Sequence, residues 1–233
     1  MPDNQAPKDA LRDAASVILV RRDREVARVL MGQRGRGAAF MPSKFVFPGG
    51  AVDRDDRGIP AAAPLPEPAA RRLRLRVDPD LGPELAEALA MAAIRELWEE
   101  AGLALSHASG TRPHNLTPDW QSFFDAGHYP AADGLEFVFR AITPPGRPRR
   151  FDARFFLTDA GRITGPLDDF SRASGELTFL SWLTLPEARE LDLPFITEVV
   201  LAEIEARLAN QDGGNRPAPF FHHREGKSFI DAL

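Results

Sequence analysis

One long helical segment near the middle of the chain constrains the fold more than any other feature. Residues 83–101 read PELAEALAMAAIRELWEEA. Alanine, leucine and glutamate are strong helix formers, proline is accepted in a first turn, and Gly102 is a natural stop. Because β-branched and aromatic segments flank this helix on both sides, we expect a single domain of mixed α/β class.

The remaining segments give an ordered pattern of strands and helices. We predict a flexible N-terminus over residues 1–12, one domain over 13–210 and a C-terminal tail over 211–233, with no internal repeat. A short aromatic strand within residues 40–50 ends in Pro-Gly-Gly. Further strands are predicted at residues 14–20, 26–33, 135–142, 151–157 and 176–182, and helices at 186–191 and 194–208.

Residues 51–82 differ from the rest of the domain. They are rich in proline, alanine, arginine and aspartate and show no sustained helix or strand period. We interpret them as a long insertion. The alternative is a linker between two domains, but 50 preceding residues are few for a stable domain without metal or disulfides.

Composition excludes several classes of function. Twenty-nine Lys and Arg against 34 Asp and Glu give a net charge of -5, which does not favour a nucleic-acid partner. The chain has no cysteine, so disulfides and thiolate sites are excluded. No apolar run reaches the roughly 20 residues that span a membrane, and the N-terminus lacks a signal-peptide core. We therefore expect a cytoplasmic protein with no membrane partner.

Three glutamates crowd one turn of the central helix. At about 100° per residue, Glu99 and Glu100 lie within about 60° of Glu96, while apolar residues occupy the opposite side. Two interpretations are open. The face is either solvated, at a small cost in repulsion, or it binds a hard cation such as Mg²⁺, which prefers carboxylate oxygens.

The spacing around these glutamates resembles the signature of the Nudix hydrolase superfamily. That signature runs G, five residues, E, seven residues, R-E-U-x-E-E-x-G-U, where U is bulky and apolar. The chain has Gly50, then Glu87, seven residues, and Arg95-Glu96-Leu97-Trp98-Glu99-Glu100-Ala101-Gly102-Leu103. The resemblance implies an α/β/α sandwich around a mixed sheet and hydrolysis of a diphosphate bond in a small molecule, with Mg²⁺, or Mn²⁺ as a substitute, as cofactor.

The match departs from the signature between Gly50 and Glu87. The signature would place this glutamate at position 56, so Glu87 comes 31 residues late, and the excess coincides with the insertion at 51–82. A Nudix branch that includes a peroxisomal coenzyme A diphosphatase also carries a long insertion inside this signature, which is called the Nudix box. The resemblance to this branch therefore favours a coenzyme A-type substrate over nucleotide sugars and dinucleotides.

The resemblance also implies roles for individual residues. Glu99 and Glu100 are expected metal ligands, the Gly49 carbonyl an additional one, and Glu96 a further ligand or the general base. Arg95 would orient the carboxylates through charge-assisted hydrogen bonds. Glu87 would support them, either at the start of the helix or through an ion pair that Arg95 could supply.

Two residues outside the box complete the predicted site. Glu176 precedes Trp182 by six residues and is a metal ligand, a base or an exposed strand residue; Arg34 ends a strand and could contact a phosphate.

The rival hypotheses are a non-catalytic Nudix-fold module that senses a nucleotide, and a structural domain with a solvated acidic helix. A homodimer, for example through the terminal helix at 194–208, is compatible with the sequence.

Overall fold

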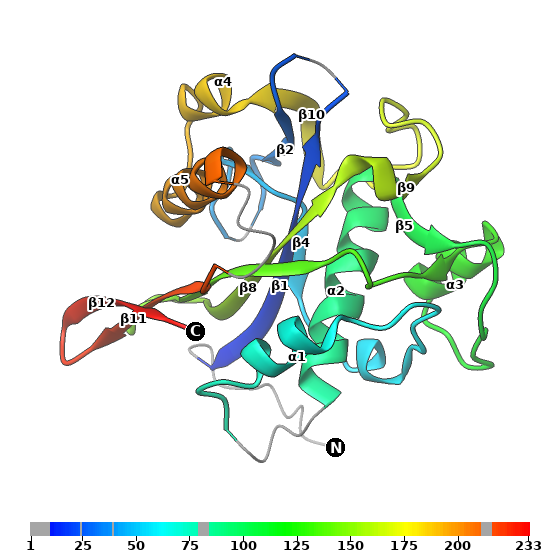
Figure 1. Ribbon diagram of the computed structural model, residues 1–233, viewed down its shortest axis with the longest axis horizontal. Coiled ribbons are helices and arrows are strands. Elements are labelled where there is room, and N and C mark those ends of the chain that lie inside the picture. Colours follow the sequence, from blue (N-terminus) through cyan, green and yellow to red (C-terminus); the bar gives the residue numbers. More distant parts are fainter. Residues whose placement is uncertain (1–9, 24, 39, 79–83, 211–215) are drawn as a thin grey trace.

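The computed structural model describes residues 10–23, 25–38, 40–78, 84–210 and 216–233. Across these residues, a nine-stranded mixed sheet runs in the order β10-β2-β1-β8-β7-β11-β12, with β3 beside β2 and β4 beside β1 (Figure 1). Its strands are β1 (Leu11–Arg21), β2 (Arg28–Arg34), β3 (Phe45–Val46), β4 (Gly49–Ala51), β7 (Glu136–Ile142), β8 (Arg150–Asp159), β10 (Leu177–Thr184), β11 (Pro219–Arg224) and β12 (Lys227–Ala232).

Helices cover both faces of this sheet, which gives the mixed α/β fold that the sequence predicted. One face carries α1 (Glu67–Leu73), α2 (Glu84–Ala101) and α3 (Pro118–Asp125), and the other carries α4 (Leu185–Arg189) and α5 (Phe195–Asn210). A small sheet of β6 (Tyr129–Pro130), β5 (Ala104–His107) and β9 (Ile163–Thr164) lies beyond the end of α2, and short 3-10 helices are η1 (Asp55–Gly58) and η3 (Ala160–Arg162).

Strand β1 separates two hydrophobic cores. Val17 and Leu19 belong to the core under α2, whereas Ile18 and Val20 belong to the core under α4 and α5. Successive side chains of a strand point to opposite faces, so the unbroken apolar run of β1 is what a strand buried on both faces requires. Parallel pairing with β8, from Leu11 opposite Arg150 to Val20 opposite Asp159, fixes β1 at the centre of the sheet.

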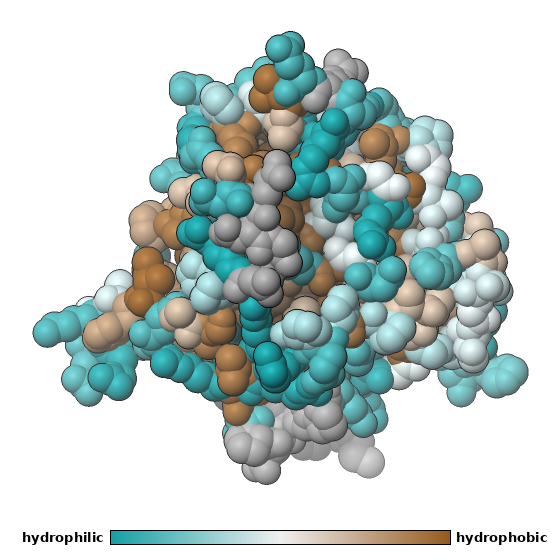
Figure 2. All heavy atoms as spheres, viewed as in Figure 1, coloured by the Kyte–Doolittle hydropathy of each residue, from teal (hydrophilic) through white to brown (hydrophobic). Residues whose placement is uncertain are grey.

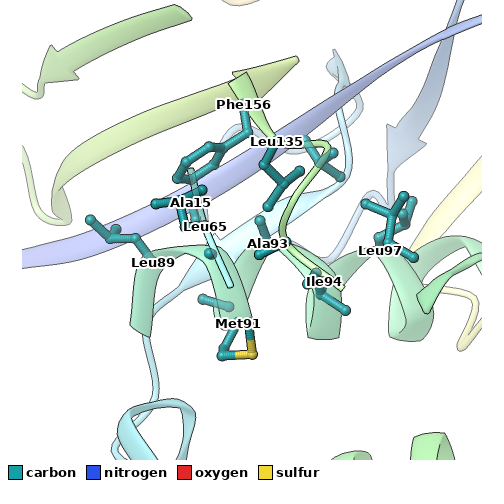
Figure 3. Packing of buried hydrophobic residues seen from close by; sticks show 14 of the residues in the cluster. Ala15, Leu65, Leu89, Met91, Ala93, Ile94, Leu97, Leu135 and Phe156 are labelled. Atoms are coloured by element: carbon teal, nitrogen blue, oxygen red, sulfur yellow. The ribbon is translucent and has the colours of Figure 1, made fainter. Parts of the chain in front are cut away.

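Helix α2 is the buried element of the domain. Its residues Leu89, Ala93 and Leu97 are fully buried and pack against the sheet (Figure 3). The helix ends at Ala101, and the next residue, Gly102, has a φ of 71°, the left-handed conformation that glycine adopts most easily after a helix. The prediction for this segment is therefore confirmed over the described residues.

The other predicted helices and strands are also present, with ends shifted by three residues or fewer. The sequence did not predict β5, β6, β9 or α3, nor β4, which takes in Gly49 and Gly50 where the end of a strand was expected. No helix among the described residues is long and apolar enough to cross a membrane.

Three predictions about irregular segments need correction. The insertion contains a helix, α1, which buries Ala69, Ala70 and Leu73 against α2. The expected tail forms β11 and β12, because β11 pairs with β7 and β12 pairs with β11; residues 211–215 of that prediction lie outside the described part of the chain. Strand β1 already begins at Leu11, inside the predicted flexible N-terminus; residues 1–9 of that prediction lie outside the described part of the chain.

Candidate functional site

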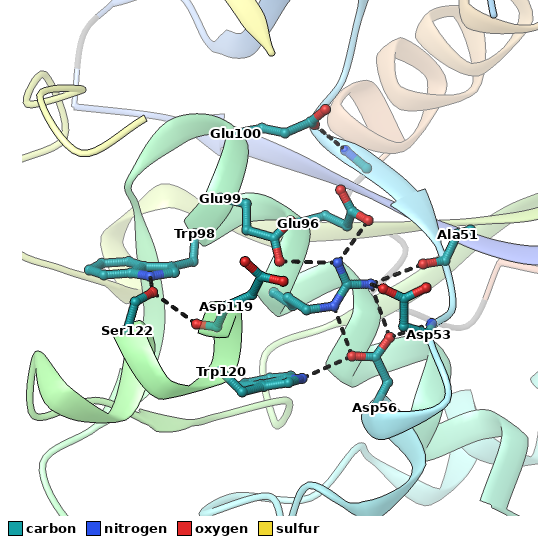
Figure 4. Close-up of polar contacts among 12 residues, drawn as sticks. Ala51, Asp53, Asp56, Glu96, Trp98, Glu99, Glu100, Asp119, Trp120 and Ser122 are labelled. Carbon is teal, nitrogen blue, oxygen red and sulfur yellow. Dashed lines mark hydrogen bonds and ion pairs between the residues drawn. The ribbon is translucent and has the colours of Figure 1, made fainter. Parts of the chain in front are cut away.

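The Gly-Gly turn and the acidic end of α2 meet beside β1. Strand β4 pairs with β1, with Gly49 opposite Ser16 and Gly50 opposite Ala15. The Gly49 amide donates a hydrogen bond to Glu100 Oε2 at 2.8 Å (Figure 4). A Cβ at Gly50 would lie 2.2 Å from Glu96 Oε1, so only glycine lets this carboxylate approach the backbone.

Arg95 holds the other two carboxylate groups of the turn. Its Nη1 donates to Glu96 Oε1 at 3.0 Å and to Glu99 Oε1 at 3.1 Å, and its Nη2 donates to the Ala51 carbonyl at 2.9 Å (Figure 4). The hydrogen bonds expected of Arg95 are therefore present. Because the Arg95 side chain is 5% exposed, these contacts are made out of water, where charge-assisted bonds are strong.

Asp56 fixes Arg95 from the other side, and the sequence analysis did not identify it. Arg95 Nε and Nη2 donate to the two carboxylate oxygens of Asp56 at 2.9 and 3.0 Å, a bidentate pair. Trp120 Nε1 donates to the same carboxylate at 3.0 Å, and the Asp53 amide does so at 2.8 Å. Asp56 is 1% exposed, and these donors compensate its buried charge.

The position of Asp56 explains the departure from the Nudix signature. Asp56 lies six residues after Gly50, where the signature has its first glutamate. The additional residues therefore come after this position, between η1 and the acidic end of α2, and not before it. The spacing from Gly50 could have identified Asp56, but the signature has a glutamate at this position and the chain has an aspartate.

Of the two alternatives for Glu87, the structure shows the first: Glu87 lies in the first turn of α2, and no ion pair joins it to Arg95 among the described residues. Glu87 lies eight residues earlier on α2, about 12 Å along the helix axis. There it accepts a hydrogen bond from the Leu65 backbone and lies near Arg74, both in the insertion. Burial, the dominant effect, raises the pKa of Glu87 above its usual value. Its contacts are with α1 and the residues that flank it, and not with the acidic turn, which is the turn of α2 that carries Glu96, Glu99 and Glu100.

The two residues predicted outside the box lie beside it. In the pairing of β10 with β2, Leu177 is opposite Arg34, and the Gly35 amide donates to the Glu176 carbonyl at 3.3 Å. Both charged groups act on the Glu100 carboxylate, Arg34 favouring and Glu176 opposing its ionisation. Among the described residues, the buried Arg34 Nε has no hydrogen-bond partner.

Known proteins with similar sequences and structures carry the Nudix name. No protein-family model matches the chain. A curated Caenorhabditis elegans protein, "Putative nudix hydrolase 7", is 33% identical over 157 residues, which are 63% of this chain and 43% of that protein. The chain thus spans less than half the length of this relative.

Two solved structures show where the architecture recurs. A NUDIX hydrolase from Alicyclobacillus acidocaldarius is 26% identical, with 83% of this chain and 90% of that chain covered and a TM-score of 0.55. A MutT protein from Methanosarcina mazei Go1, 13% identical, covers 88% of this chain and 99% of its own with a TM-score of 0.50. The fold is that of the Nudix hydrolases. Together with the curated relative, this likeness supports a place for the chain in the Nudix superfamily.

The acidic end of α2 carries an excess of buried negative charge. Burial, followed by the charge of Glu96, raises the pKa of Glu100 to about 8. Burial likewise raises the pKa of Glu99 to about 7, although Arg95 opposes it, and raises the pKa of Glu96. One guanidinium does not compensate this group of carboxylates.

The donor set fits a hard divalent cation. Three carboxylates and a backbone carbonyl are oxygen ligands of the kind that Mg²⁺ and Mn²⁺ take, and a cation would supply the missing positive charge. Among the described residues, no three acidic or histidine side chains converge on one point. Arg95 bonds to Oε1 of Glu96 and Oε1 of Glu99, and the second oxygen of each carboxylate is of the kind that binds a cation.

Proposed function

We propose that the protein is a metal-dependent hydrolase that cleaves a diphosphate bond in a small organic or nucleoside derivative. One observation carries this proposal: Glu96, Glu99 and Glu100 gather beside the Gly49–Gly50 backbone around an Arg95 that Asp56 holds in place. A merely solvated acidic helix would not bury Glu100, which is 2% exposed.

Each residue has a role that follows from its position. Glu99, Glu100 and the Gly49 carbonyl would hold Mg²⁺, or Mn²⁺ in its place. When bound, the cation supplies charge neutralisation for the diphosphate and acidifies a water molecule. Glu96 would take the proton of the attacking water, with Glu176 as the second candidate for this base.

Arg34 is the proposed contact for the substrate's phosphate. Its buried Nε, which has no partner among the described residues, would donate a hydrogen bond to a phosphate oxygen.

A coenzyme A-type substrate remains a proposal that rests on the insertion inside the box. The insertion's helix packs against α2, so the additional segment is part of the domain that carries the site.

The test is hydrolysis of a panel of diphosphates by the native protein, with and without Mg²⁺ or Mn²⁺. The panel holds coenzyme A, an acyl-coenzyme A, NADH, ADP-ribose, a nucleoside triphosphate and a dinucleoside polyphosphate. We expect metal-dependent turnover of at least one compound and a loss of about 100-fold or more in Glu100→Gln. Glu84→Gln, the same change at an exposed position on the same helix, is the matched control.

Binding measurements separate this proposal from its rival, a non-catalytic nucleotide-sensing module. Glu100→Gln removes a proposed metal ligand, so it should also abolish any rise in melting temperature that Mg²⁺ or Mn²⁺ produces in the native protein. If the native protein binds a compound of the panel but cleaves none with either metal, the sensing module is the better explanation.

A further inference from the structure

The C-terminal hairpin forms an exposed edge of the main sheet. Strands β11 and β12 project from the body of the molecule (Figure 1), and β12 is last in the strand order. Five of the six residues of β12 are exposed, including Phe229 at 36% and Ile230 at 62%. Adjacent exposed hydrophobic side chains on a sheet edge favour pairing with another chain.

The hydrogen-bonding groups of this edge can be assigned from the hairpin. Ala218 and Leu233 exchange both backbone hydrogen bonds, at 3.1 and 2.9 Å. In an antiparallel ladder such pairs alternate, so Asp231, Phe229 and Lys227 also bond to β11. The amides and carbonyls of Ser228, Ile230 and Ala232 therefore point outward. Over the described residues, no other strand pairs with this side of β12.

Strand β12 lacks two of the features that usually prevent edge pairing, proline and a β-bulge, although it carries the charged residues Lys227 and Asp231. Residues 227–232 read KSFIDA, with no proline, and their register with β11 is continuous, with no bulge. Glu225 and Gly226, with φ of 51° and 74°, form the tight two-residue turn that holds such hairpins in a fixed twist. The edge is thus already formed for a partner strand.

The sequence of β12 is complementary to itself. When two copies run antiparallel with Phe229 opposite Phe229, Lys227 of each copy lies opposite Asp231 of the other. Ser228 then lies opposite Ile230, and both residues present outward-pointing backbone groups, so the ladder between the copies can form.

Side chains on one face extend this complementarity. Phe229 stacks on His222, with ring centroids 5.6 Å apart, and His222 stacks on Phe220 at 4.6 Å. A second Phe229 would continue this row of rings across the symmetry axis, and aromatic pairs directly opposite each other stabilise a sheet. Asp231 also accepts from His222 and pairs with Arg76, so Lys227 of the other copy would be an additional partner.

We propose that β12 pairs with β12 of a second copy of this chain about a two-fold axis at Phe229, which makes one sheet continuous through a homodimer. This inference goes beyond the proposed activity and does not depend on it. It also places the dimer contact on the hairpin and not on α5, the terminal helix considered from sequence.

Charge exchange tests the proposed register. Sedimentation velocity on the full chain, at several concentrations, should show a dimer for the native protein. Lys227→Glu places glutamate opposite Asp231, and Asp231→Lys places lysine opposite Lys227, so each variant alone should associate at least about tenfold more weakly. Mixed together, the two variants regain both opposite-charge pairs and should form a heterodimer.

The mixture distinguishes an interface from a folding defect, because a damaged fold would not recover on mixing. Circular dichroism first establishes that each variant is folded, and sedimentation velocity is then measured on the mixture. A monomeric native protein, or two folded variants that stay monomeric when mixed, would overturn the proposal. A dimer unaffected by either change would place the interface on another surface and overturn it as well.

A single cysteine provides a second readout. The chain has no cysteine, so Phe229→Cys introduces the only thiol. In the proposed register the two new side chains are directly opposite, with Cβ atoms about 5 Å apart, and should form an intermolecular disulfide on mild oxidation. Lys227→Cys is the control, since its equivalent lies about 13 Å along the partner strand. Cross-linking at 227 but not at 229 would contradict the register.

Discussion

Arg95 donates hydrogen bonds to Asp56, Glu96, Glu99 and the Ala51 carbonyl while almost completely buried. Burial by itself lowers the pKa of Arg95, but the hydrogen bond and charge of Asp56, with the two glutamates, more than offset it and raise the pKa. The guanidinium therefore stays charged. At the residue scale, the geometry of the acidic turn depends on this one cation and its bidentate partner.

Asp56→Ala should damage both stability and activity. It leaves the Arg95 charge buried without its bidentate partner, which costs about 3–5 kcal/mol, and it frees Arg95 to move with Glu96 and Glu99. Urea unfolding gives the loss of stability, and the diphosphate panel gives the loss of activity.

Glu87→Gln is the comparison for this prediction. Glu87 contacts the Leu65 backbone away from Arg95, so we expect a loss of stability below about 1 kcal/mol and little change in turnover. Equal losses in the two variants would show that Glu87, and not Asp56, supports the acidic turn.

At the scale of elements, the insertion belongs to the core. Helix α1 contributes Ala69, Ala70 and Leu73 to the same cluster as α2 and β1, and η1 contributes Asp56 to the site. A linker between two domains would have neither property. The weak periodicity of this segment reflects its short helix, because seven residues hold fewer than two full turns.

Leu73→Ala should destabilise the protein by about 2–5 kcal/mol, since it opens a cavity between α1 and the core. Leu75→Ala is the matched control, because Leu75 is 43% exposed whereas Leu73 is 2% exposed. For Leu75→Ala we expect a change within about 0.5 kcal/mol by chemical denaturation. A Leu73→Ala variant as stable as its control would mean that α1 can detach without cost.

At the scale of the whole molecule, the two cores share their strands. Val17 and Leu19 pack under α2 while Ile18 packs under α5, so neither core survives without β1. The hydrophobic surface in Figure 2 is broken by polar side chains, and the large apolar clusters lie inside. The two layers of helices are therefore mechanically coupled through one sheet.

This coupling predicts a single unfolding transition. Far-UV circular dichroism reports both helical layers, whereas fluorescence reports Trp98, Trp120 and Trp182, all of which belong to or pack against the core on the α2 side. The two signals should give the same midpoint at one protein concentration, because association would shift it. Separate midpoints would indicate that the layers unfold independently.

Local patterns in the sequence predicted the elements whose identity is decided within a few residues. The helix formers of α2, the stop at Gly102 and the apolar run of β1 determine those elements, since each residue's preference agrees with its neighbours'. The spacing of Gly50, Arg95, Glu96, Glu99 and Glu100 also determined the fold family and the composition of the acidic turn.

Contacts between distant residues decided the rest. Asp56 meets Arg95 across 39 positions, β11 joins β7 across about 80, and α1 is helical beside α2; these pairings depend on packing that no local period encodes. The sequence by itself determined which residues could form the site and the sheet's centre. Only the tertiary structure decided that Asp56, not Glu87, holds Arg95, and that the last strands form an open edge, because burial and backbone pairing are satisfied by partners brought together from far along the chain.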